Sequence, residues 1–170
     1  MIFNQLFDDI SSTYTYIIAS DRGREALIID PVLEKTDEYL NILKKLDLKL
    51  VKVIDTHIHA DHITGLNELG KRTNCTKIMG EQSKSEVVDL KVKEDDKIEI
   101  DKIELKTIYT PGHTDCSYSF LMNDRVFTGD TLLINGTGRT DFQNGSAKTQ
   151  YDSLFNKLLK LPEKTIVYPA

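Results

Sequence analysis

Residues 56–62 are the part of this chain whose residue types point most directly to chemistry. Their sequence, Thr-His-Ile-His-Ala-Asp-His, places three histidines and one aspartate in six consecutive positions, directly after an apolar run. Imidazole and carboxylate groups are the donors that borderline divalent metals prefer. The spacing therefore predicts a metal site.

Two later segments each add one residue of the same kind after a strand-like run. His113 lies in Pro-Gly-His-Thr and Asp130 lies in Thr-Gly-Asp, and the chain has no histidine outside these segments and the first one. Pro111 and Gly112 constrain the backbone before His113, and Gly129 permits close approach before Asp130. We expect these ligands to converge from three strand ends.

The first loop has enough donors for two half-sites. His57 and His59 are two positions apart, so their side chains can face the same side of extended backbone, and Asp61 and His62 return to that side after a turn. Two histidines and one carboxylate on one face of a metal are typical of non-heme Fe(II) oxygenases. A set rich in histidine also suits zinc, which activates water for hydrolysis. Spacing alone leaves the metal open.

The elements that position these residues follow from the hydrophobic pattern. β-branched and aromatic runs predict two strands at 14–19 and 25–30 with a turn at 21–24 between them, and apolar residues at helical spacing predict a helix over 34–46. Further strands are expected at 50–54, 76–79, 97–100, 103–109, 117–122, 125–127 and 165–168, further helices at 64–71 and 148–159, and a glycine-rich loop at 135–145. This order predicts sheets sandwiched between helices, with the site at the carboxyl ends of strands.

Composition limits the remaining possibilities. The chain has 170 residues, 39% of them apolar and 29% charged, which predicts one globular domain over 1–170. The net charge of −5 with scattered Lys and Arg disfavours a nucleic-acid partner. Cys75 and Cys116 form no disulfide framework, and no segment approaches the roughly 20 apolar residues of a membrane span. We therefore expect a cytoplasmic protein without a membrane partner.

Three segments together resemble the metallo-β-lactamase superfamily: residues 56–65 (Thr-His-Ile-His-Ala-Asp-His-Ile-Thr-Gly), 111–114 (Pro-Gly-His-Thr) and 127–130 (Phe-Thr-Gly-Asp). The resemblance covers essentially the whole chain and implies an α/β fold, the αβ/βα sandwich. The run 132–143 resembles the persulfide dioxygenase branch, and glyoxalase II differs from that branch in this loop.

The resemblance implies one Fe(II) per chain, with zinc as the alternative, held by His57, His113 and Asp130. The positions that bind a second metal in hydrolytic relatives are occupied here by His59, Asp61 and His62. In dioxygenases, these positions are expected to orient the ligands and to form hydrogen bonds near substrate and oxygen.

The implied reaction converts a small persulfide, usually glutathione persulfide, and O₂ into sulfite and thiol, as in sulfide detoxification. The resemblance is also compatible with a homodimer. Arg139 has two interpretations: a contact to a carboxylate of the thiol carrier, or an ion pair with Asp141, which we rate slightly ahead. Cys116 is expected to be a small buried filler, because its segment contains no cation to lower its pKa.

The last strand departs from the superfamily pattern. In the family it leads into a His-Asp-Tyr segment, whereas this chain stops at Val-Tyr-Pro-Ala, residues 167–170. We therefore expect a domain that lacks its C-terminal closing segment. Two alternatives to the dioxygenase stay open: a two-metal zinc thioester hydrolase of the glyoxalase II type, which would miss its final histidine, and a non-catalytic metal-binding fragment. A phosphodiesterase is less favoured because the chain is acidic.

Overall fold

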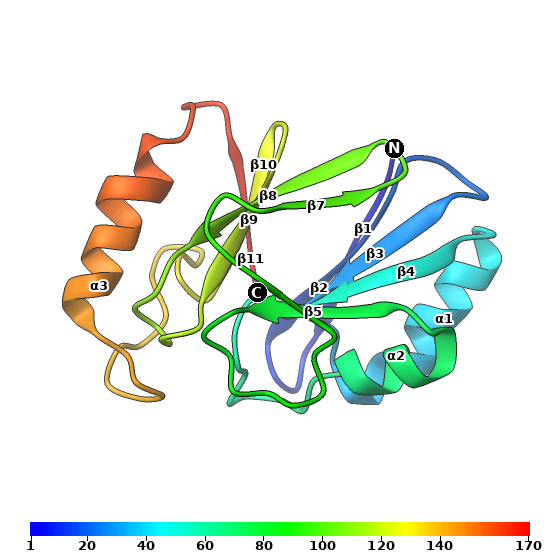
Figure 1. Cartoon of the computed structure of the whole chain (residues 1–170), viewed down its shortest axis with the longest axis horizontal. Coiled ribbons are helices and arrows are strands. Elements are labelled where there is room, and N and C mark those ends of the chain that lie inside the picture. Colours follow the sequence, from blue (N-terminus) through cyan, green and yellow to red (C-terminus); the bar gives the residue numbers. More distant parts are fainter.

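The computed structural model describes residues 1–170 and consists of two sheets with helices on their outer faces (Figure 1). The first sheet has six strands in the order β1-β2-β3-β4-β5-β6, and the second has five in the order β11-β10-β9-β8-β7. The strands of the first sheet are β1 (Ile2–Asp8), β2 (Thr13–Ala19), β3 (Glu25–Ile29), β4 (Lys49–Ile54), β5 (Thr76–Gly80) and β6 (Leu90–Val92). Those of the second are β7 (Lys97–Ile100), β8 (Ile103–Tyr109), β9 (Tyr118–Met122), β10 (Arg125–Gly129) and β11 (Ile166–Pro169).

Two helices cover the outer face of the first sheet. Strands β3, β4 and β5 run parallel, and parallel neighbours need a crossover connection, which α1 (Thr36–Lys45) and α2 (Leu66–Thr73) provide. A short 3₁₀ turn, Leu33–Lys35, leads into α1. The apolar layer beneath the helices includes Tyr39 and Leu43 of α1 and Leu66 and Leu69 of α2.

The second sheet is covered by the chain between β10 and β11. This segment begins as α3 (Ala147–Asp152) and continues through a π turn, Ser153–Lys157, and a 3₁₀ turn, Leu158–Lys160. Leu154 and Leu158 pack against Val126 of the sheet. This helix layer lies on the face of the second sheet that points away from the first sheet (Figure 1).

The main core lies between the two sheets. Residues alternate along β2, so that Tyr16 and Ile18 face the second sheet while Ile17 and Ala19 face the helices. Both faces of this strand are therefore buried, which explains its unbroken apolar run. Phe120 of the second sheet is fully buried in the same core.

The structure confirms the αβ/βα sandwich and most of the expected elements. Two strands, β1 and β6, were not predicted. Strand β6 has only three residues, and β1 lies at a sheet edge, where its side chains are mostly half-exposed and give a weak alternation. The helix expected over 148–159 is α-helical only in its first part, because the π turn begins at Ser153.

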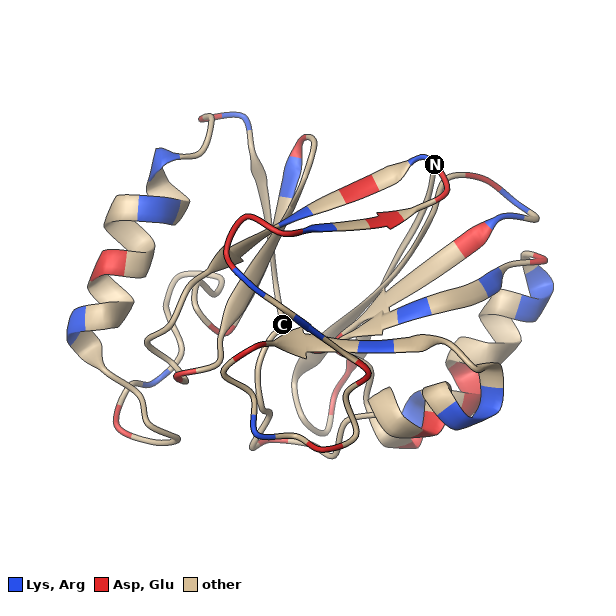
Figure 2. Cartoon of the chain, viewed as in Figure 1, with Lys and Arg blue, Asp and Glu red and all other residues tan.

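Charges of both signs are interspersed over the helices and the strand ends (Figure 2). None of the helices has the length and apolar composition of a membrane span.

The core between the sheets makes a first prediction. Phe120→Ala removes a fully buried ring and should lower the free energy of unfolding by about 3–5 kcal/mol, measured by chemical denaturation. Ile10→Ala is the matched control, because Ile10 is 90% exposed, and it should change that free energy by no more than about 0.5 kcal/mol. Equal losses in the two variants would contradict the placement of the core.

Candidate metal centre

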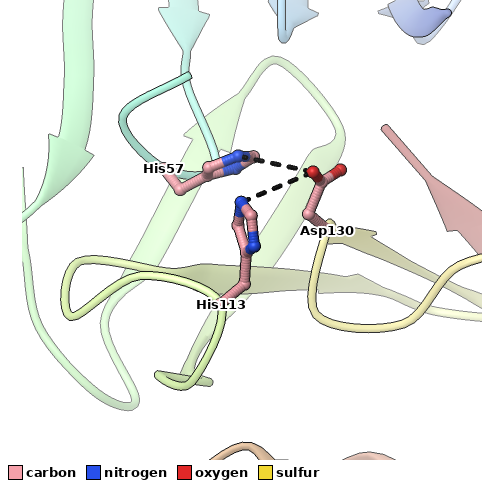
Figure 3. Close-up of side chains that lie close together, drawn as sticks. All are labelled: His57, His113 and Asp130. Atoms are coloured by element: carbon pink, nitrogen blue, oxygen red, sulfur yellow. Dashed lines mark ion pairs between the residues drawn. The ribbon is translucent and has the colours of Figure 1, made fainter. Parts of the chain in front are cut away.

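The three residues expected to bind metal meet at one edge of the sandwich. His57 follows β4 of the first sheet, whereas His113 and Asp130 follow β8 and β10 of the second, and their side chains point toward one another (Figure 3). The Oδ2 atom of Asp130 lies 4.0 Å from Nε2 of His57 and 3.5 Å from Nε2 of His113. The ligand-type atoms of all three residues lie within 4.8 Å of one another.

Hydrogen bonds determine which nitrogen of His57 faces this point. The Thr56 hydroxyl donates its proton to Oδ2 of Asp30 over 2.9 Å, so the same oxygen accepts a hydrogen bond from Nδ1 of His57, also at 2.9 Å. The backbone N–H of Thr56 donates to Oδ1 of Asp30 over 2.7 Å. With its proton on Nδ1, His57 presents the lone pair of Nε2 toward Asp130, as a metal ligand requires.

His113 is oriented in the same way by the backbone. Its Nδ1 donates to the carbonyl oxygen of Arg139 over 2.8 Å, which leaves Nε2 as the free acceptor. The loop that carries Arg139 approaches so closely that a Cβ at Gly138 would lie 2.5 Å from the carbonyl oxygen of Asp130 and 2.7 Å from Nδ1 of His113. Only glycine permits this contact.

Gly129 serves the same purpose before Asp130. It has φ +51°, and a Cβ there would lie 2.4 Å from the Thr56 hydroxyl. A side chain would therefore push apart the hydrogen bonds that orient His57. Because Gly129 has no side chain, the Thr-Gly-Asp segment can place the Asp130 carboxylate close to the histidine loop.

The protonation states suit a cation. Burial, together with the neighbouring His59 and His113, lowers the pKa of His57 far below its usual value, so this imidazole is neutral as metal ligation requires. Burial raises the pKa of Asp130, against the opposing influence of His113. A divalent ion would stabilise the ionised carboxylate. Two imidazole nitrogens and one carboxylate oxygen on one face fit a mononuclear site.

The other residues of the first loop form a separate group beside it. The ligand-type atoms of His59, Asp61 and His62 also lie within 4.8 Å of one another. Asp61 accepts hydrogen bonds from the Thr13 hydroxyl at 2.9 Å and from Nδ1 of His62 at 3.0 Å. Nε2 of His62 is buried without a hydrogen-bond partner. The structure therefore divides the loop into the two half-sites expected from its spacing.

Charge is balanced within this second group. Burial alone would raise the pKa of Asp61, but its hydrogen bond with His62 and the nearby His59 hold it below its usual value. Burial likewise acts to lower the pKa of His59, but this is outweighed by Asp30, whose Oδ1 lies 3.1 Å from Nε2 of His59, and the pKa rises to about 9. Asp30 thus contacts His59 of this half-site directly and is linked to His57 of the other half-site through Thr56.

Sequence analysis missed three residues of this centre: Asp30, Thr13 and the hydroxyl of Thr56. Asp30 directly follows the apolar strand β3 and precedes a proline, the same position at a strand end that Asp130 has after β10. That position was the available signal. Nothing local marks Thr13, which reaches Asp61 only because the β1–β2 hairpin folds beside the loop.

The structure also bears on Arg139 and Cys116. Arg139 forms a two-pronged ion pair with Asp141, at 2.7 and 3.0 Å, as the favoured interpretation predicted. It also lines, with His113 and Asp130, a cavity of about 490 Å³ at the metal centre, so its contact with substrate stays a prediction. Cys116 is buried, as expected of a small filler, and burial raises the pKa of its thiol.

The fold and the site are those of a known family. The family model described as "Metallo-beta-lactamase superfamily" matches residues 8–88 and 80–170. A hydroxyacylglutathione hydrolase of Buchnera aphidicola is 33% identical, over 93% of this chain and 61% of that protein. The chain belongs to the metallo-β-lactamase superfamily.

Its nearer likeness is to one branch of that superfamily. The mouse protein "Persulfide dioxygenase ETHE1, mitochondrial" is 42% identical over 100% of this chain and 68% of its own length. The crystal structure of ETHE1 from Myxococcus xanthus has a TM-score of 0.97 and 49% identity, and the match covers 99% of this chain and 75% of that one. The branch is therefore that of the persulfide dioxygenases.

The hydrogen bond from His57 to Thr56 makes a second prediction. Thr56→Val removes the oxygen that holds Nδ1, and the affinity for Fe(II) or zinc should fall by about 10–100-fold in a chelator competition. Thr56→Ser keeps the hydroxyl and should retain the wild-type affinity. Equal affinity in the Val variant and the wild type would show that this hydrogen bond does not orient the ligand.

Proposed function

We propose that this protein is an iron-dependent persulfide dioxygenase. It oxidises a small persulfide such as glutathione persulfide with O₂ and water to sulfite and the free thiol, a reaction of sulfide detoxification. The observation that carries the proposal is the face formed by Nε2 of His57, Nε2 of His113 and the carboxylate of Asp130, in a chain of the persulfide dioxygenase branch. Two histidines and one carboxylate are the ligand set of non-heme Fe(II) oxygenases.

The protein would hold one Fe(II) with these three side chains. A bound Fe(II) supplies the redox chemistry that O₂ requires, whereas the protein supplies geometry and a pocket. The side chains come from three strand ends of two sheets, so their positions are rigid relative to one another. The cavity in front of them has apolar walls at Leu133 and Phe142, which suit the methylene groups of a thiol carrier.

His62 would accept a proton next to this cavity, behind Asp61. Because Nδ1 of His62 donates to Asp61, its buried, partnerless Nε2 is an acceptor for a water beside the site. Asp61, which lines the cavity, fixes the tautomer of His62. We assign to His59 a role in positioning, because Asp30 holds its ring from behind.

A zinc-dependent thioester hydrolase of the glyoxalase II type is the second candidate. The grouping of His59, Asp61 and His62 favours it, since a two-metal hydrolase uses donors at these positions. The hydrolase relative is less similar than the mouse persulfide dioxygenase, at 33% against 42% identity. A phosphodiesterase has no such support.

Location and assembly belong to the proposal as well. The substrates are a small persulfide and O₂, with no nucleic-acid or membrane partner, and a homodimer is compatible with the fold. The cytoplasm stays our expectation from the sequence, whereas the mouse relative is named as mitochondrial. The chain spans 68% of that relative's length.

The reaction is tested by oxygen uptake. Anaerobically prepared, Fe(II)-loaded protein should consume O₂ when glutathione persulfide is added and should release sulfite, and His113→Ala should do neither because it removes one of the three ligands. Folded, iron-loaded protein that takes up no oxygen would contradict the proposal. Cleavage of a glutathione thioester by the zinc-loaded form would then assign the hydrolase, and no turnover in either assay would assign a non-catalytic metal-binding fragment.

The two half-sites are expected to respond differently to mutation. His57→Ala, His113→Ala and Asp130→Ala should each abolish iron binding, measured by metal analysis after desalting. His62→Ala should keep its iron and lose about 100-fold in oxygen uptake, because it removes a proton acceptor and no ligand. Equal loss of iron in His62→Ala would overturn this division of roles.

A further inference from the structure

The β1–β2 hairpin is joined to the histidine loop by a row of hydrogen bonds. Asp8, the last residue of β1, accepts one from the backbone N–H of Ser11 at 2.9 Å. The Ser11 hydroxyl lies 2.8 Å from Oδ2 of Asp8 and 2.9 Å from Oγ1 of Thr13. Thr13, the first residue of β2, in turn donates to Oδ2 of Asp61 over 2.9 Å. The paired strands of the hairpin therefore hold the Asp61 carboxylate in place.

Thr13 contacts two residues of the second half-site at the same time. Its Oγ1 lies 2.9 Å from Oδ2 of Asp61 and 3.2 Å from Nδ1 of His62, and these two atoms lie 3.0 Å from each other. Thr13 is buried, and a hydrogen bond is stronger in such surroundings than in water. The hydroxyl and the imidazole N–H thus both point to one carboxylate oxygen, and the three groups stabilise one another.

This arrangement turns the free nitrogen of His62 away from Asp61. Nδ1 and Nε2 lie on different sides of the imidazole ring, so the lone pair of Nε2 points away from Asp61 while Nδ1 donates to it. Nε2 is buried there without a partner. A metal ion needs the lone pairs of its ligands directed at it from about 2.0–2.2 Å. Asp61 and His62 cannot both supply such lone pairs to one ion in this arrangement.

We propose that Thr13 is a positioning residue that keeps the second half-site free of metal, so that the centre binds one ion. Its hydroxyl occupies Oδ2 of Asp61 and fixes the ring of His62. Loss of the hydroxyl frees this oxygen and lets the ring turn its Nε2 toward Asp61, which completes a second set of donors with His59. The inference rests on the proposed function, because it explains how a loop with donors for two ions serves one-metal chemistry.

The test counts metal ions and does not depend on turnover. The 170-residue chain and its variants are equilibrated with excess zinc, the ion expected of a two-metal hydrolase, then desalted and analysed for metal per chain. The wild type should hold about one zinc and Thr13→Val about two, a twofold rise, because Val has no hydroxyl to hold Asp61 and His62. Thr13→Ser restores the hydroxyl and should return the content to the wild-type value.

Thr107→Val is the matched control. Thr107 is a fully buried threonine of β8 whose hydroxyl donates to the backbone carbonyl oxygen of Lys93, so the variant removes the same group outside the metal centre. It should hold as much zinc as the wild type. The proposal is overturned by two zinc ions in the wild type, in Thr13→Ser or in Thr107→Val, and equally by a single ion in Thr13→Val.

A second measurement uses the wild type alone and so does not depend on the folding of a variant. Long-range ¹H–¹⁵N NMR spectra of the zinc-loaded chain should show His62 with its proton on Nδ1 and with Nε2 free of metal. A His62 nitrogen bound to zinc would overturn the proposal.

Neither measurement involves a persulfide, so the two proposals fail separately. A chain that shows the expected zinc contents but consumes no oxygen supports the role of Thr13 and contradicts the dioxygenase reaction alone. A chain that binds two ions and consumes oxygen with glutathione persulfide contradicts the role of Thr13 alone.

Discussion

The buried carboxylate of Asp30 is the constraint on which the site depends. A buried carboxylate must be satisfied by hydrogen bonds, and this one accepts from the backbone and hydroxyl of Thr56 and faces Nε2 of His59. Its backbone has φ +50°, which is uncommon for a residue other than glycine. Because Thr56 in turn holds Nδ1 of His57, one side chain at the end of β3 fixes the loop after β4 and the tautomer of a proposed ligand.

The second sheet completes the site by a different means. There the backbone does most of the positioning, since the carbonyl oxygen of Arg139 holds His113 and Gly129 and Gly138 let loops pack against the ligands. The shared core keeps the two halves in register, because rings such as Tyr16 and Phe127 pack across the gap between the sheets at a centroid distance of 5.0 Å. Rigid sheets thus position the functional residues of the loops, as α/β proteins commonly do.

Sequence analysis was sufficient where residue type and local spacing carry the information. The residue types and spacing of His57, His113 and Asp130 predict a metal site. Long apolar runs such as β2 predict buried strands. It was insufficient where a role arises from tertiary contact. Asp30 gains its importance from a neighbouring strand, and the cavity at the metal centre joins segments far apart in the chain. The edge strand β1 was not predicted because most of its side chains are half-exposed, so apolar and polar residues do not alternate clearly along it.

The central claim is that hydrogen bonds behind the two imidazoles aim both Nε2 atoms at a single metal ion beside Asp130. Anomalous diffraction at the iron edge from crystals of the Fe(II)-reconstituted protein tests this most directly. The account predicts one peak per chain, bonded to Nε2 of His57, Nε2 of His113 and the carboxylate of Asp130. A peak among His59, Asp61 and His62, or ligation through Nδ1 of His57 or His113, would contradict it.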